Sequence, residues 1–466
     1  MPSFPSAAIR FPFLLFLSAV VCITAVCFAQ SKDTAAAANP PRVVVKNQGF
    51  LPFADAPINY RSENLDDPIA RLQKRLDSGE TVLRFDAKRG YLKSVLDALR
   101  VPVSSQALVF SKTSFQFPEI TPQTPRALYY NDDVYVGRVH SGKFLEFVSF
   151  DPMQGAIFYV LDEHQAERPK FERAEVDCVQ CHVAASTHNV PGVLMRSVFT
   201  RSSGYLAAGT HSFVTGHESP MSQRWGGWYV TAARGAEAGM ANVLVSDPKN
   251  PEQINRAAGA NLTTLAGHFK NSDYLTGTSD VVALMVLAHQ TQMHNLITLT
   301  NYQTRFALST DGQISDAARK KFEGAAEQLV RYLLFTNEAP LASPVAGTSG
   351  FAEEFATRGP RDPRGRSLRD FNLRTRIFKY PCSYLVYSED FDAIPEPAKS
   401  YIYRRLFEVL SGRDQSSEFA SLKSEDRQAI LEILVATKPG LPAEWKQFVQ
   451  QTSTNSIRAS AGVANR

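Results

Sequence analysis

Residues 128–161, LYYNDDVYVGRVHSGKFLEFVSFDPMQGAIFYVL, contain four runs of aromatic and β-branched residues. Turn sequences such as Ser141-Gly142 and Asp151-Pro152 separate these runs. Side chains of this kind favour strands, and the turn residues let the chain reverse direction. The stretch therefore predicts an antiparallel β meander with strands near 128–130, 134–139, 144–150 and 156–161.

Helical periodicity flanks the meander on both sides. Apolar residues recur at helical spacing in 67–76 and 90–99, ahead of the strands. Four longer patterns follow the meander, and Ser279 and Ser315 are predicted N-caps for the first two of them. These patterns cover 280–308, 315–336, 398–410 and 425–437.

A second short stretch, Cys178-Val179-Gln180-Cys181-His182, carries the chemistry. Two cysteines separated by two residues and followed directly by histidine are the attachment signature for c-type haem. The two thiols add to the vinyl groups of the porphyrin, and the adjacent imidazole becomes the proximal iron ligand. We therefore predict one covalent haem c, held by Cys178 and Cys181, with its iron bound by His182.

Two other readings of a CxxC pair stay open at this stage. A redox pair usually lies at the start of a helix that follows a strand. A zinc site needs two further Cys or His ligands at similar spacing.

The N-terminus predicts export, which haem attachment of this kind requires. Arg10 precedes an apolar run from 11 to 29 that ends in Cys27-Phe28-Ala29, the pattern of a secretory signal peptide. We predict cleavage near Ala29, with retention as a membrane anchor as the alternative. Cleavage removes two of the five cysteines and leaves Cys382, predicted to be a buried thiol, beside the motif pair. The mature protein is thus expected to be periplasmic or secreted, without a transmembrane span.

Charge and length limit the function further. The chain has 50 basic and 46 acidic residues, interspersed, so no nucleic-acid partner is expected. At 466 residues it is much longer than a simple electron carrier needs. Most of the polypeptide must therefore do something besides hold one haem.

Several residues are candidates to complete the haem site. A backbone carbonyl usually orients a proximal histidine, and Val190-Pro191-Gly192 is a plausible source of one. In the cluster 224–229, Arg224 is a candidate for pairing with a haem propionate. Trp225 and Trp228 are candidates for stacking on the porphyrin. A sheet edge with aromatic core residues is the alternative interpretation of this cluster.

The distal iron ligand is the main functional question. Methionine or histidine there gives an electron carrier, whereas an open position permits peroxide chemistry. Met240 and His217 rank first among the candidates, ahead of His188, Met195, His211 and Met221. His289 and His294 are five residues apart on a predicted helix, so both cannot face one metal. We expect each to be buried with a hydrogen-bond partner.

With these residues identified, the chain resembles a family of large exported bacterial proteins that contain a cytochrome c domain with a single CxxCH. The resemblance implies covalent haem at Cys178 and Cys181 and iron ligation by His182. Relatives often carry a His-Met pair where this chain has Gly239-Met240, a departure that bears on the distal ligand. The resemblance implies no substrate. It rests on 126–137, the haem motif with 190–192, 219–220, 224–231, 289–291, 293–295 and the stretch from 365–371 to 403–406.

Together these features predict an α+β protein in which a β meander leads into a cytochrome c-like haem segment and then a mainly helical region. The expected regions are a signal peptide (1–29), a flexible lead-in (30–48), a helical and β-meander region (49–170), a haem-binding region (171–275), a helical C-terminal region (276–450) and a polar tail (451–466).

We expect single-electron transfer with a redox partner protein or a small-molecule electron donor or acceptor. The alternatives are a haem-dependent, peroxidase-like oxidoreductase and a binding or sensor module in which the haem serves as a staple.

Overall fold

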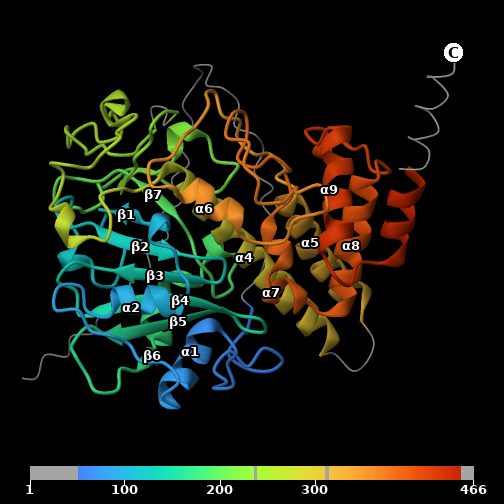
Figure 1. Ribbon diagram of the computed structural model, residues 1–466, viewed down its shortest axis with the longest axis horizontal. Coiled ribbons are helices and arrows are strands. Elements are labelled where there is room, and N and C mark those ends of the chain that lie inside the picture. Colours follow the sequence, from blue (N-terminus) through green and yellow to red (C-terminus); the bar gives the residue numbers. More distant parts are fainter. Residues whose placement is uncertain (1–50, 236–238, 310–313, 453–466) are drawn as a thin grey trace, which may run out of the picture. The chain divides into compact units, whose positions relative to one another are not determined.

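The predicted meander forms the centre of a seven-stranded antiparallel sheet. The computed structural model describes residues 51–235, 239–309 and 314–452. The four predicted strands are β2 (Arg126–Tyr130), β3 (Val134–Arg138), β4 (Phe144–Asp151) and β5 (Gly155–Asp162). Three short strands complete the order β6-β5-β4-β3-β2-β1-β9, in which Figure 1 shows β1 to β6 side by side. They are β1 (Ala107–Val109), β6 (Phe171–Arg173) and β9 (Trp228–Tyr229).

Helices cover both faces of this sheet because its side chains alternate between them. On one face lies α1 (Pro68–Asp77), whose N-cap Asp67 receives a hydrogen bond from the hydroxyl of Tyr159 at 2.7 Å. On the other lies α4 (Val281–Leu308), where the hydroxyl of Tyr130 donates to the carbonyl of Ala283 at 2.6 Å. The second predicted N-terminal helix is also present, as α2 (Leu92–Ala98). The α+β prediction is confirmed.

The long helix α4 begins one residue later than its predicted cap implies. Asp280 is the N-cap, and its carboxylate accepts from the backbone N–H of Val282 at 2.8 Å. Ser279 instead donates to the carbonyl of Tyr229 at 2.6 Å and accepts from the N–H of Leu108 at 2.9 Å. The prediction of Ser279 as the cap is wrong, because this hydroxyl joins the start of α4 to strands β9 and β1.

The helical C-terminal region agrees with its sequence pattern. Its predicted helices are α5 (Asp316–Leu333), α8 (Glu396–Leu410) and α9 (Ser424–Thr437), and Ser315 caps α5 as predicted. Shorter pieces, α6 (Phe351–Thr357) and α7 (Glu389–Asp392), lie between α5 and α8.

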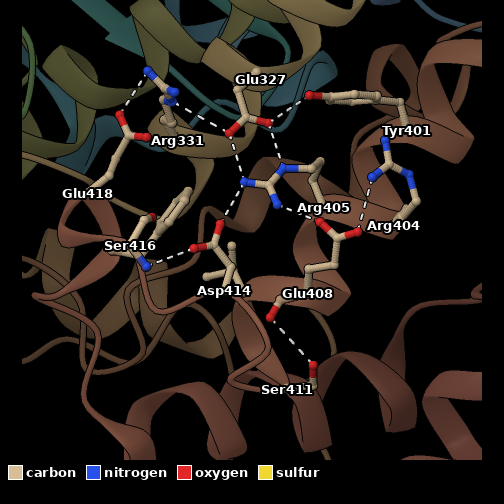
Figure 2. A network of polar contacts seen from close by, with 12 residues as sticks. Glu327, Arg331, Tyr401, Arg404, Arg405, Glu408, Ser411, Asp414, Ser416 and Glu418 are labelled. Carbon is tan, nitrogen blue, oxygen red and sulfur yellow. Dashed lines mark hydrogen bonds and ion pairs between the residues drawn. The ribbon is translucent and has the colours of Figure 1, made fainter.

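A network of charged side chains joins α5 to α8 (Figure 2). Arg405 on α8 donates to both carboxylate oxygens of Glu327 on α5, at 2.9 and 3.1 Å, and to Asp414 at 2.8 Å. Its pKa is raised, chiefly by the hydrogen bonds to Glu327. Arg331 extends the network to Glu418 at 2.8 Å. Arg405, Glu327, Arg331, Asp414 and Glu418 thus each have an opposite partner, which stabilises the packing of the two helices.

Segments from two of the predicted regions pair in the seven-stranded sheet. Strand β9 comes from the predicted haem-binding region, yet it pairs with β1 of the meander region. A small two-stranded sheet of β7 (Arg196–Val198) and β8 (Ser212–Val214) lies in the same stretch of chain. Among the described helices, none combines the length and apolar character needed to cross a membrane. The predicted signal peptide, the lead-in and all but the first two residues of the predicted tail lie outside the described residues.

Candidate haem site

The haem motif lies on a short surface helix, α3 (Glu175–His182), which directly follows β6. None of its residues is fully buried: Cys178 and His182 are partly buried, Cys181 is exposed, and both thiols are free. At 100° per residue, the side chains of Cys178, Cys181 and His182 fall within an arc of about 100° around the helix. Both thiols and the imidazole therefore project from one side of α3, as attachment to a single porphyrin requires.

The helix also bears on the two alternative readings of the CxxC pair. Cys178 is the fourth residue of α3 and Cys181 lies in its last turn, whereas a redox pair usually begins at the helix N-terminus. Within the described ranges, no group of three or more His, Cys, Asp or Glu side chains could hold a metal ion, so a zinc site lacks its further ligands. The position of the pair on α3 is thus unusual for a redox pair, and haem attachment stays a prediction.

The imidazole of His182 is oriented by a backbone carbonyl. Its Nδ1 lies 2.7 Å from the carbonyl oxygen of Gly192, and the N–H of Gly192 donates back to the carbonyl of His182 at 3.0 Å. A carbonyl only accepts, so Nδ1 carries the hydrogen and the lone pair lies on Nε2. That tautomer is the one a proximal iron ligand needs. The predicted source of this carbonyl, the turn 190–192, is confirmed.

The surroundings keep the ring of His182 neutral and the thiol of Cys178 protonated. Burial lowers the pKa of His182, so it is the uncharged imidazole, the metal-binding form, at neutral pH. Burial, reinforced by the charges of Glu146 and Asp177, raises the pKa of Cys178 to about 12. The ring of His182 packs against Phe158 on β5, with the ring centres 4.9 Å apart.

An ion pair that the sequence did not single out lies beside the motif. Arg126 on β2 pairs with Glu146 on β4, and both charges act on Cys178 and on His182. A Cβ at Gly137, on the strand between them, would lie 2.7 Å from the guanidinium of Arg126. Arg126 was visible in the sequence only as the start of the meander, because its partner is on a different strand.

The predicted haem-contacting cluster occupies the sheet edge. Trp228 is part of β9, and its indole N–H donates to the carbonyl of Arg196 at 2.7 Å. Trp225 is buried in the main hydrophobic core. Arg224 is also buried and donates to the carbonyls of Ser219 at 2.7 Å and His217 at 2.8 Å. The sheet-edge interpretation is confirmed, and contact of these three side chains with haem stays a prediction.

The structure argues against His217 as the distal ligand. Its Nδ1 lies 2.9 Å from Nδ1 of His289, and its Nε2 lies 3.2 Å from the carbonyl of Thr336. Its ring stacks on Tyr332 at 4.0 Å and on Phe335 at 4.8 Å. With both nitrogens engaged inside an aromatic cluster, this imidazole has no lone pair to offer to iron.

Met240 is buried in a small cluster of its own. It packs with Phe199 and Ala207, and its sulfur accepts a hydrogen bond from the hydroxyl of Ser197 at 3.6 Å. Cys178 packs against the main core cluster instead. The described contacts do not bring Met240 and the haem motif together, so its role as distal ligand stays a prediction.

The two histidines of α4 have separate partners, as expected from their spacing. Nε2 of His289 lies 2.8 Å from the hydroxyl of Ser383. His294 pairs through Nδ1 with Asp390 at 3.0 Å and stacks on Phe150 at 3.8 Å. Burial opposes its protonation, but the hydrogen bond to Asp390 outweighs that effect, so the pKa of His294 is raised. Both are core residues with partners, which confirms the prediction made for them.

No protein-family model, curated protein or solved structure matches this chain. The family resemblance drawn from its motifs therefore stays a prediction, and the functional argument rests on the site itself.

Proposed function

We propose that this protein is an exported c-type cytochrome with one covalent haem, which transfers single electrons to or from a redox partner. The observation that carries the proposal is the 2.7 Å contact between Nδ1 of His182 and the carbonyl of Gly192. It leaves Nε2 as the basic nitrogen, on the same side of α3 as the two thiols. A chance CxxCH sequence has no reason to be followed by this carbonyl.

The residues of the motif fit a covalently attached haem. Cys178 and Cys181 would hold the porphyrin edge through thioethers, and His182 would bind the iron on the proximal side. Haem supplies the one-electron chemistry when it is bound. The protein supplies a fixed, neutral imidazole and a charged pair, Arg126 and Glu146, whose field acts at the motif.

Retention of haem under denaturing conditions tests this proposal. The mature chain, produced with haem-attachment machinery, should keep one haem through acid–organic extraction and gain the mass of one haem per chain. Cys178→Ser combined with Cys181→Ser should abolish the retention. Cys382→Ser is the matched control, because that thiol is buried away from solvent, and it should retain the haem. Complete extraction of haem from the wild-type protein would refute the proposal.

A second function, a peroxidase-like haem oxidoreductase, is favoured by one specific observation. His217 is engaged elsewhere, and Met240 lies in a separate cluster. An open distal position is what peroxide chemistry requires. Absorption and magnetic circular dichroism spectra of the ferric and ferrous protein distinguish the two functions. A low-spin spectrum unchanged by cyanide or carbon monoxide supports the carrier, and a high-spin spectrum with peroxide turnover supports the enzyme.

A further inference from the structure

The long helix α4 holds the loop that carries the carbonyl partner of His182. Two side chains one helical turn apart, Gln292 and Asn295, reach this loop from α4. Gln292 forms a hydrogen bond with the ring of His188, and Asn295 binds the backbone of Val193. Side chains of α4 thus bind the loop at two points, His188 and Val193, and Val193 directly follows Gly192.

The contact of Asn295 is two-sided and fully buried. Its Oδ1 accepts from the N–H of Val193 at 2.9 Å, and its Nδ2 donates to the carbonyl of Val193 at 2.7 Å. A backbone N–H only donates and a carbonyl only accepts, so the orientation of the amide is defined by its partners. The side chain is shielded from solvent, which makes the loss of either bond costly. Residue 193 therefore has one position relative to α4.

Gly192 is a glycine because of Asn295. A Cβ at position 192 would lie 2.2 Å from Oδ1 of Asn295 and 3.0 Å from its Cγ. The backbone of Gly192 does not have a positive φ, so its conformation alone would accept alanine. Thr187 fixes the other side of the turn, with its hydroxyl donating to the carbonyl of Val190 at 2.9 Å. The amide of Asn295 and the residue that accepts from His182 are thus packed directly against each other.

We propose that Asn295 is a positioning residue for the proximal ligand: it holds the Gly192 carbonyl at hydrogen-bond distance from His182 and so tunes the iron. This inference rests on the proposed haem function. A strong hydrogen bond at Nδ1 makes the imidazole a more basic ligand, which favours ferric iron and lowers the reduction potential. A residue of α4, far from the motif in sequence, would thus influence the iron through the turn that orients His182.

The first test compares two buried asparagines of α4 in the haem-loaded protein. Asn295→Ala should move the midpoint potential to more positive values and shift the proton NMR signals of the His182 ring. Asn301→Ala is the matched control, because Asn301 is also buried but donates to the carbonyls of Ala393 and Pro152, at 3.2 and 3.4 Å. It should cost stability and leave the potential unchanged. Equal potentials for Asn295→Ala, Asn301→Ala and wild type would overturn the inference.

A second test remains decisive even where Asn295→Ala is poorly stable. Gly192→Ala alone should push the turn away from Asn295 and raise the potential. In the Asn295→Ala background the two closest contacts of the added methyl group are removed and only the Cβ of Thr187, at 3.2 Å, remains near it, so the two substitutions should be strongly non-additive in potential and in thermal unfolding. Additive effects would show that the two residues act independently and would refute the proposal that Asn295 positions the Gly192 carbonyl. Wild-type protein without covalent haem would instead refute the proposed function, so the two failures are distinguishable.

Discussion

The surface helix α3 and the buried pair His217–His289 both contain histidines that form hydrogen bonds. The number of these bonds and the surroundings of the rings differ. In α3 no residue is fully buried, and the imidazole of His182 has a carbonyl on one nitrogen only. In the buried pair, each ring has partners on both nitrogens and stacks on Phe335, at 4.8 Å for His217 and 4.2 Å for His289. The first arrangement leaves a lone pair for a ligand, and the second uses every polar atom internally.

The hydrogen-bond directions in the buried pair follow from its end partners. The carbonyl of Thr336 requires a hydrogen on Nε2 of His217, whose Nδ1 must then accept from His289. Nε2 of His289 is left to accept from the hydroxyl of Ser383. All hydrogen bonds from Thr336 through the two histidines to Ser383 are formed with both rings neutral. The pair is therefore a structural feature of the core. A histidine that is satisfied on both sides has only a packing role, whereas one satisfied only at Nδ1 keeps a lone pair with which it could bind a metal.

Alanine substitutions in α3 and in the buried pair should differ most clearly in their effects on the absorption spectrum and on the free energy of unfolding. His182→Ala should remove the proximal ligand and change the absorption spectrum entirely, while the free energy of unfolding of the haem-free chain changes by less than about 1 kcal/mol. His289→Ala should cost roughly 3 kcal/mol, since it leaves a cavity and two unsatisfied partners, and keep the haem spectrum. Urea unfolding and absorption spectra measure both. A changed spectrum in His289→Ala would show that the comparison is mistaken.

Acid should remove the stability that the buried pair contributes, as it should for His182 and His188, whose pKa values burial also lowers. Burial lowers the pKa of His217 to about 3, and burial together with His217 holds that of His289 well below its usual value. Unfolded histidines titrate near 6.5, so the unfolded chain binds more protons, and this stability is full above about pH 6.5 and lost as pH falls toward 3. The two rings together should lose on the order of 2 kcal/mol between pH 7 and 5.5.

Groups with a raised pKa act in the opposite direction and must be separated from this effect; they include Asp133, Glu338, Glu163 and His294. Burial raises the pKa of Asp133 and of Glu338 to about 7, so their contribution to stability grows as pH falls from 7. The double variant His217→Phe, His289→Phe keeps these carboxyl groups and the aromatic stacking. Its unfolding free energy, measured at pH 7 and 5.5, should lack the loss attributed to the pair. An unchanged pH dependence would contradict the assignment.

The smallest effect is expected at Met240. Met240→Leu conserves volume in the cluster with Phe199 and Ala207, so it should cost less than about 1.5 kcal/mol. Because the described contacts of Met240 are with its own cluster and with Ser197, the spectrum of the ferric protein should not change. A switch from low-spin to high-spin absorption would make Met240 the distal ligand and confirm the prediction from sequence.

Much of the fold was predictable because its signals are local. The meander alternates aromatic and β-branched runs with turn residues, and all four predicted strands are present at nearly their predicted bounds. Helices α5, α8 and α9 likewise follow from apolar periodicity. The cap of α4 was misassigned by one residue, because Ser279 and Asp280 both have capping side chains and only the sheet decides which of them is free to cap.

For the site, the sequence by itself determined the thiols, the imidazole and the turn that supplies its carbonyl. These groups lie within 15 residues of one another, so their spacing is written directly in the chain. Only the tertiary structure decided that Asn295 holds Val193 across 102 positions and that His217 meets His289 across 72. Hydrogen-bond partners at such separations depend on how the sheet and α4 pack, and no local pattern of residues encodes that geometry.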